Sequence, residues 1–222
     1  MRMPFDSKDP HAGQPVVAQG PKPTDARLTM ILVHGRGASA DDIIGLAQEL
    51  QFDDVAYLAP QAAGNTWYPY SFLAPMEQNE PGISSAIRVL SRLLESLGAQ
   101  GVDSERIALL GFSQGACLAL EFAARHARRY AGVFALSGGL IGPPGTPRNY
   151  PGTFDGTPVF LGCSDIDPHI PVERVHESAE VFGRMDAKVD ERIYPRMGHT
   201  VNHDEIRAIQ DILGARPAHA SQ

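Results

Sequence analysis

Short apolar runs alternate along this chain with longer stretches in which apolar residues recur every three or four positions. The short runs 28–33, 55–59, 107–110, 132–136 and 159–161 predict strands, and 189–194 is strand-like. The run 28–33, which is bounded by glycine, fits a strand buried on both faces. The stretches with helical spacing are 40–50, 83–97, 114–126, 171–185 and 203–213. Ser39 precedes the first of these and is expected to cap it. The alternation is typical of the α/β class, with a mostly parallel central sheet and helices on both faces.

The regular pattern occupies one domain, which we place at 27–214. Residues 1–26 contain five prolines and two glycines, a spacing that breaks any regular helix, and we interpret them as an extended arm lying on the domain. A short edge strand at Val16-Val17-Ala18 is the less favoured alternative. Residues 215–222 are assigned to a C-terminal tail.

Composition narrows the classes of function. The 222 residues carry a net charge of −7, which argues against nucleic acid as a partner because phosphate binding needs a basic surface. No apolar run approaches the roughly 20 residues of a membrane-spanning helix, so stable membrane insertion is not expected. The start of the chain lacks the apolar stretch of a secretory signal, and Cys117 and Cys163 do not form a disulfide framework. We therefore expect a cytoplasmic protein.

The sequence Gly-Phe-Ser-Gln-Gly at 111–115 carries the strongest chemical signal. It lies between the predicted strand 107–110 and the predicted helix 114–126. A tight strand-to-helix turn exposes the Ser113 hydroxyl above the sheet, and flanking glycines remove Cβ atoms that would clash there. The backbone N–H of Gln114 then points to where a carbonyl oxygen would become negative. An ordinary glycine-rich turn is the alternative interpretation.

A serine hydroxyl needs a base, and that base is usually a histidine held by a carboxylate. His199 is the best candidate, because it follows the last predicted strand and Gly198 allows its loop to turn back toward the serine. The acid is expected in the loop after strand 159–161, where Asp165 and Asp167 compete. A surface histidine at position 199 is the alternative.

Six stretches together resemble the α/β-hydrolases, and more narrowly the phospholipase/carboxylesterase family that includes the acyl-protein thioesterases. They are Leu-Val-His-Gly-Arg-Gly at 32–37, Leu-Ala-Pro-Gln-Ala at 58–62, Gly-Phe-Ser-Gln-Gly-Ala at 111–116, Leu-Ser-Gly-Gly at 136–139, Asp-Pro-His-Ile-Pro at 167–171 and Met-Gly-His at 197–199. The resemblance implies a single-domain α/β-hydrolase fold, Asp167 as the acid, and the backbone N–H of Arg36 as a second oxyanion donor. It is weaker over 63–80 and 140–156, the loops that would shape the substrate site. The Arg36 side chain would bind an anionic group or reach solvent, and solvent is favoured.

The loop after strand 55–59 holds an aromatic cluster. Trp67, Tyr68 and Phe72 are candidate substrate-binding residues, since pockets are lined mainly by apolar and aromatic side chains, and a local core under the loop is an equal alternative. His34 is interpreted as a structural hydrogen-bonding residue, and His169 as a surface residue rather than part of the site rim.

No cofactor is expected. His199 and His203 stand four residues apart, but no His-Glu-x-x-His motif or third ligand accompanies them, so no metal site is predicted. Phosphate-cradling glycine motifs are missing after the first strand, which argues against nucleotide binding.

These residues predict a serine carboxylesterase that hydrolyses a small-molecule ester through an acyl-enzyme intermediate. Short- to medium-chain acyl esters are expected, because the sequence shows no inserted helical lid. The resemblance also admits an acyl-protein thioesterase or a lysophospholipase, and it admits a homodimer. A ligand-binding protein that retains the serine turn without catalysis is the alternative of a different class.

Overall fold

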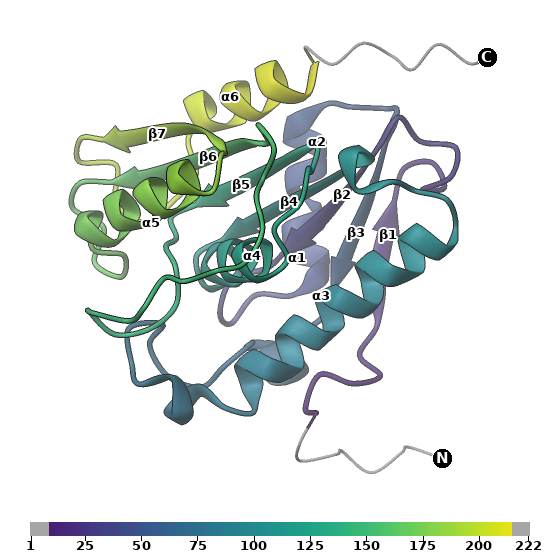
Figure 1. Cartoon of the computed structure of the whole chain (residues 1–222). Helices are drawn as coiled ribbons and strands as arrows, with labels where there is room; N and C mark the ends of the chain where they lie inside the picture. Colours follow the sequence, from purple (N-terminus) through teal and green to yellow (C-terminus); the bar gives the residue numbers. More distant parts are fainter. Residues whose placement is uncertain (1–8, 215–222) are drawn as a thin grey trace.

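The computed structural model describes residues 9–214, so the first eight residues of the predicted arm and the predicted tail 215–222 lie outside it. Seven strands form one sheet in the order β1-β3-β2-β4-β5-β6-β7, and every neighbouring pair is parallel except β1 with β3 (Figure 1). The strands are β1 Val16–Gln19, β2 Leu28–Val33, β3 Val55–Pro60, β4 Ile107–Phe112, β5 Gly132–Leu136, β6 Pro158–Ser164 and β7 Lys188–Tyr194. The predicted α/β class with a mostly parallel sheet is confirmed.

Helices cover both faces of the sheet (Figure 1). They are α1 Ala40–Ile44, α2 Leu46–Leu50, α3 Gly82–Ala99, α4 Gln114–Arg125, α5 Val172–Arg184 and α6 His203–Gly214, with 3₁₀ turns η1 Ala63–Asn65, η2 Met76–Asn79 and η3 Ser104–Arg106. Successive residues of a strand point to opposite faces. In β4, Ile107 and Leu109 accordingly pack in the core with α3, α4 and α5, whereas Ala108 and Leu110 pack with α1, α2 and α6. Burial on both faces explains why the central strands β2, β4 and β5 have apolar sequences.

The first predicted helix is broken in two. Ser39 caps α1 as expected: its Oγ accepts the N–H of Asp42, and the Asp42 carboxylate accepts the N–H of Ser39 at 2.7 Å. The sequence predicts one helix over 40–50, but Gly45 separates α1 from α2. Glycine is a poor helix former, and the apolar spacing alone did not reveal this break.

The arm contributes an edge strand, so the less favoured alternative of a short strand at Val16-Val17-Ala18 is the one that the structure shows. β1 pairs antiparallel with β3, from Val16 opposite Pro60 to Gln19 opposite Tyr57. The pairing covers backbone groups of β3 that would otherwise form an open edge. Upstream of it, the buried His11 ring lies between two backbone groups: Nε2–H donates to the carbonyl of Trp67 and Nδ1 accepts the N–H of Ala63.

Within 9–214, none of the helices combines the length and the apolar character that crossing a membrane requires.

Candidate active site

Ser113 occupies the sharp turn between β4 and α4. Its backbone has φ 55° and ψ −120°, a conformation that residues with a side chain rarely adopt. A Cβ atom on Gly111 would overlap the carbonyl of Gly115, and one on Gly115 would overlap the carbonyl of Val33. Both glycines of the motif are therefore required by close packing of backbone on backbone, and the predicted strand–serine–helix turn is confirmed.

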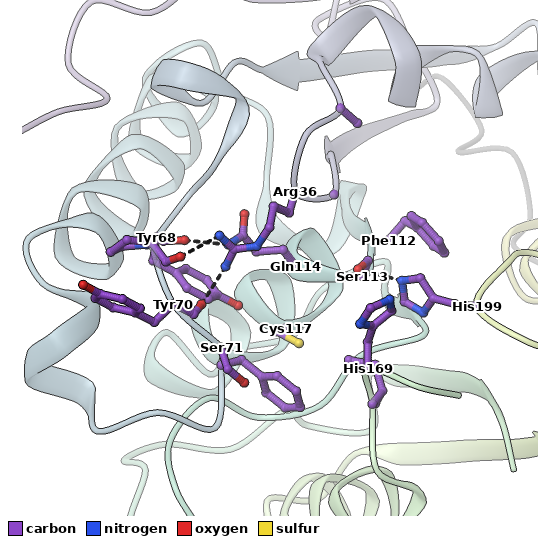
Figure 2. A pocket seen from close by; sticks show the side chains of 15 residues that line it. Arg36, Tyr68, Tyr70, Ser71, Phe112, Ser113, Gln114, Cys117, His169 and His199 are labelled. Carbon is purple, nitrogen blue, oxygen red and sulfur yellow. Dashed lines mark hydrogen bonds between the residues drawn. The ribbon is translucent and has the colours of Figure 1, made fainter. Parts of the chain in front are cut away.

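Three side chains from the carboxyl ends of β4, β6 and β7 form one hydrogen-bonded chain. His199 Nε2 lies 2.8 Å from Ser113 Oγ (Figure 2). His199 Nδ1 lies 2.7 Å from Asp167 Oδ2. An acceptor carboxylate at Nδ1 favours the tautomer with its proton there, which leaves Nε2 free to accept the hydroxyl proton of Ser113.

The Asp167 carboxylate is fully buried, but it accepts several hydrogen bonds. Its Oδ1 accepts the backbone N–H groups of His169 and Ile170 at 2.8 and 3.1 Å. Burial alone would raise the pKa of Asp167, but hydrogen bonds from His199 and from these two N–H groups outweigh it and hold the pKa below its ordinary value. The group facing the imidazole is therefore an anion at neutral pH.

Asp165 contacts the backbone of the histidine loop instead. Its Oδ1 accepts the N–H of Arg196 at 2.7 Å, and its own N–H donates to the carbonyl of Tyr194. Of the two competing aspartates, Asp167 is the one that is hydrogen-bonded to His199. Asp165 is hydrogen-bonded to the backbone of the loop that carries His199.

A pocket of about 460 Å³ opens beside the serine (Figure 2). Its lining residues are Gly35, Arg36, Ala38, Tyr68, Pro69, Tyr70, Ser71, Phe72, Phe112, Ser113, Gln114, Cys117, His169, Ile170 and His199. Of the predicted aromatic residues, Tyr68 and Phe72 line the pocket, but Trp67 does not. Trp67 is fully buried in the core, and its Nε1–H donates to the carbonyl of His34 at 2.9 Å. The expectation of Trp67 as a pocket residue is corrected, because the loop turns its ring inward.

A family model described as Phospholipase/Carboxylesterase matches residues 12–215. The chain belongs to this family. A solved phospholipase/carboxylesterase from Dyadobacter fermentans is 43% identical, with a TM-score of 0.88 over 90% of this chain and 97% of that one. Acyl-protein thioesterase 1 of Saccharomyces cerevisiae is 26% identical over 85% of this chain and 92% of its own. A Bacillus cereus carboxylesterase, 19% identical with a TM-score of 0.72 over 91% and 94%, shares the fold. This protein is thus an α/β-hydrolase and a hydrolase of the carboxylesterase class.

In this family member the Gln114 side chain fastens the aromatic loop to the serine turn, a role that the sequence analysis missed. Its Oε1 accepts the N–H of Trp67 at 2.9 Å and its Nε2 donates to the carbonyl of Tyr68 at 2.9 Å. The sequence had assigned Gln114 only a backbone function. A polar residue at the start of an apolar helix was the available signal, but its partners lie 46 and 47 positions away.

The Arg36 side chain also contacts the aromatic loop. The residue is exposed, as expected, yet its Nη1 donates to Thr66 Oγ1 and to the carbonyl of Pro69, and its Nη2 donates to the carbonyl of Tyr70. The sequence favoured a side chain that simply reaches solvent. The structure shows one that is held in place over the pocket.

Two further histidines support the site. His34 is buried, its Nδ1–H donating to the carbonyl of Gly35 and its Nε2 accepting the N–H of Ala62, and burial lowers its pKa. The predicted structural role of His34 is confirmed. His169 is exposed but lines the pocket, with its ring edge-on to His199 at 4.8 Å between centroids, so it belongs to the rim.

Metal ligands do not gather anywhere in residues 9–214: no group of three His, Cys, Asp or Glu side chains is placed to hold an ion. Cys117 and Cys163 are both buried and unpaired.

Proposed function

We propose that this protein is a serine carboxylesterase that hydrolyses short- to medium-chain acyl esters through an acyl-enzyme intermediate. The observation that carries the proposal is the hydrogen-bonded chain from Ser113 through His199 to Asp167 at the wall of an open pocket. A nucleophile, a base and an orienting acid within hydrogen-bond reach are the parts that acyl transfer requires.

In the first half-reaction, Ser113 Oγ attacks the ester carbonyl carbon while His199 Nε2 takes the hydroxyl proton. The carbonyl oxygen becomes negative and accepts hydrogen bonds from the backbone N–H groups of Gln114 and Arg36, both at residues lining the pocket. The carbon–oxygen bond to the alcohol then breaks, and His199 gives its proton to the departing alcohol.

In the second half-reaction, water replaces the alcohol. His199 takes a proton from the water, whose oxygen attacks the carbonyl carbon of the acyl-enzyme, and the carboxylic acid leaves as Ser113 regains its proton. Asp167 remains ionised throughout: its low pKa suits a group that stabilises the imidazolium without taking the proton.

Pocket size supports the range of substrates. About 460 Å³ lies in the lower half of the range for small-molecule sites, roughly 300–1,000 Å³, and accommodates an acyl chain of modest length. Acyl-protein thioesterase is the second candidate, because relatives from Saccharomyces cerevisiae and Kluyveromyces lactis, each 26% identical, carry that name. A thioester presents the same carbonyl carbon to the serine.

A fluorophosphonate tests the nucleophile directly. We expect stoichiometric labelling of Ser113, located by peptide mass spectrometry, and loss of labelling and of ester turnover by several orders of magnitude in Ser113→Ala. A folded wild-type protein that resists the reagent and cleaves no ester would instead be a ligand-binding protein. A series of p-nitrophenyl esters of graded chain length, run beside an acyl thioester and a lysophospholipid, ranks the candidate substrates.

A further inference from the structure

The pocket wall carries a single permanent charge. Among its fifteen lining residues there is no Asp, Glu or Lys, and Arg36 is the only arginine. Within 9–214, no carboxylate lies within ion-pair distance of its guanidinium, whose hydrogen-bond acceptors are one hydroxyl and two carbonyls. A single guanidinium thus belongs to a residue that lines the pocket beside Ser113, in a chain whose net charge is −7.

The guanidinium is fixed in orientation and keeps free donors. Nη1 donates to Thr66 at 3.2 Å and to Pro69 at 2.8 Å, Nη2 donates to Tyr70 at 2.6 Å, and Cζ lies 5.9 Å from the Tyr68 ring centroid. Neither Nε–H nor the second Nη2–H has a hydrogen-bond partner in the described part of the chain. Nε and Nη2 form one edge of the guanidinium, and such an edge matches the two oxygens of a carboxylate.

The position of Arg36 determines which part of a substrate meets this charge. In Figure 2, Arg36 and Tyr70 lie on one side of Ser113, and His199 lies on the other. The departing alcohol must leave on the side of His199, since His199 supplies its proton. The oxyanion meets the backbone N–H groups of Gln114 and Arg36, so the acyl chain takes the remaining direction, along the part of the pocket lined by Tyr68, Tyr70 and Phe72. The Arg36 side chain bonds this part of the wall at the Tyr70 carbonyl.

We propose that this pocket selects esters whose acyl chain ends in a carboxylate, that is, half-esters of short dicarboxylic acids. The inference rests on the proposed esterase function and names its substrate class. The free edge of Arg36 binds the distal carboxylate, the aromatic side chains of Tyr68 and Phe72 contact the methylene chain, and the bond chemistry at Ser113 is unchanged. Water and the half-ester give the dicarboxylate and the alcohol.

The test compares pairs of substrates that differ by one charge. For the acyl side these are monomethyl adipate and dimethyl adipate, followed by pH-stat; for the alcohol side they are 4-acetoxybenzoate and its methyl ester, followed by absorbance. We expect wild type to have the higher kcat/KM on monomethyl adipate and no such preference on 4-acetoxybenzoate. In Arg36→Gln the adipate preference should fall about tenfold or more, as for loss of a hydrogen bond to a charged group.

The readout is the preference ratio, that is, kcat/KM for monomethyl adipate divided by kcat/KM for dimethyl adipate. A ratio is needed because Arg36→Gln also loosens the loop at 66–70 and will slow the hydrolysis of both esters. Arg184→Gln, which removes the same charge from an exposed site on α5, is the matched control and should leave the ratio unchanged. Wild type itself provides a second measurement. Its preference should shrink between low salt and about 1 M sodium chloride, where charges are screened beyond about 3 Å.

The outcomes separate the two proposals. Turnover of dimethyl adipate without preference for the half-ester, or a preference confined to 4-acetoxybenzoate, overturns the substrate assignment and leaves the esterase standing. Absence of turnover on all four esters, with Ser113 unreactive toward a fluorophosphonate, overturns the esterase itself.

Discussion

Glu205 offers a sharp test of how burial affects stability, because its carboxyl group is buried and has one hydrogen-bond partner among the described residues. It lies in the first turn of α6 with its side chain against Gly162, and it is fully buried. Oε2 accepts the N–H of Asn202 at 2.8 Å, whereas Oε1 has no hydrogen-bond partner among the described residues. Burial raises its pKa to about 7 from 4.5, the Asn202 N–H opposes the rise, and the negative charge of Asp204 adds to it.

A raised carboxyl pKa destabilises the folded protein as the pH increases. Between the two pKa values the folded state keeps a proton that the unfolded state has lost, so the free energy of unfolding falls with rising pH. The difference of about 2.5 units, at about 1.4 kcal/mol per unit, gives a loss of about 3 kcal/mol. The loss begins near the unfolded pKa of 4.5 and is complete above the folded pKa of about 7.

Glu205→Gln removes this titration and keeps an oxygen that can accept the Asn202 N–H. Its free energy of unfolding relative to wild type should therefore increase by about 3 kcal/mol between about pH 4.5 and pH 7.5. Urea unfolding across this range measures it, followed by the fluorescence of Trp67, the one tryptophan, which is fully buried. Burying the amide changes the free energy of unfolding by an amount that does not depend on pH. This amount therefore does not affect the change measured between the two pH values.

Glu180→Gln, at an exposed position on α5, is the matched control and should retain the pH dependence of wild type. If the stability difference for Glu205→Gln changes by less than about 1 kcal/mol over the range, the carboxyl is solvated in the folded protein and burial does not raise its pKa.

Further predictions concern the active site. Asp167→Asn should lower kcat far more than Asp165→Asn, because only Asp167 bonds the imidazole; the reverse ranking in steady-state kinetics would exchange their roles. Gly115→Ala should cost about 1–3 kcal/mol of stability in urea, since its Cβ overlaps backbone, whereas Gly98→Ala in α3, which meets open space, should not destabilise.

Local sequence was sufficient for the serine turn and for six of the seven strands. An apolar run followed by Gly-x-Ser-x-Gly and a helix fixes the conformation of residues 107–126, because the signals are adjacent in the chain. Short-range patterns gave the wrong prediction at two places, the helix over 40–50 and the N-terminal arm. The apolar spacing over 40–50 hid the break at Gly45, and the prolines of the arm hid β1, whose stability comes from pairing with β3.

Contacts between distant segments decided the rest. Asp165 and Asp167 stand two residues apart in one loop, and only the folded path of the chain turns one toward His199 and the other toward Arg196. Likewise, the sequence favoured pocket and core equally for Trp67, and only the folded loop turns its ring into the core.

The sequence by itself determined the α/β architecture, the strained serine turn and the chain order of the three reactive groups, because hydrophobic period and glycine sterics act over a few residues. Only the tertiary structure decided which side chains meet in the pocket. Ser113 and His199 are 86 positions apart, and Arg36 is held by loop carbonyls more than thirty positions away. Such contacts depend on how strands and loops pack in three dimensions, which no local pattern encodes.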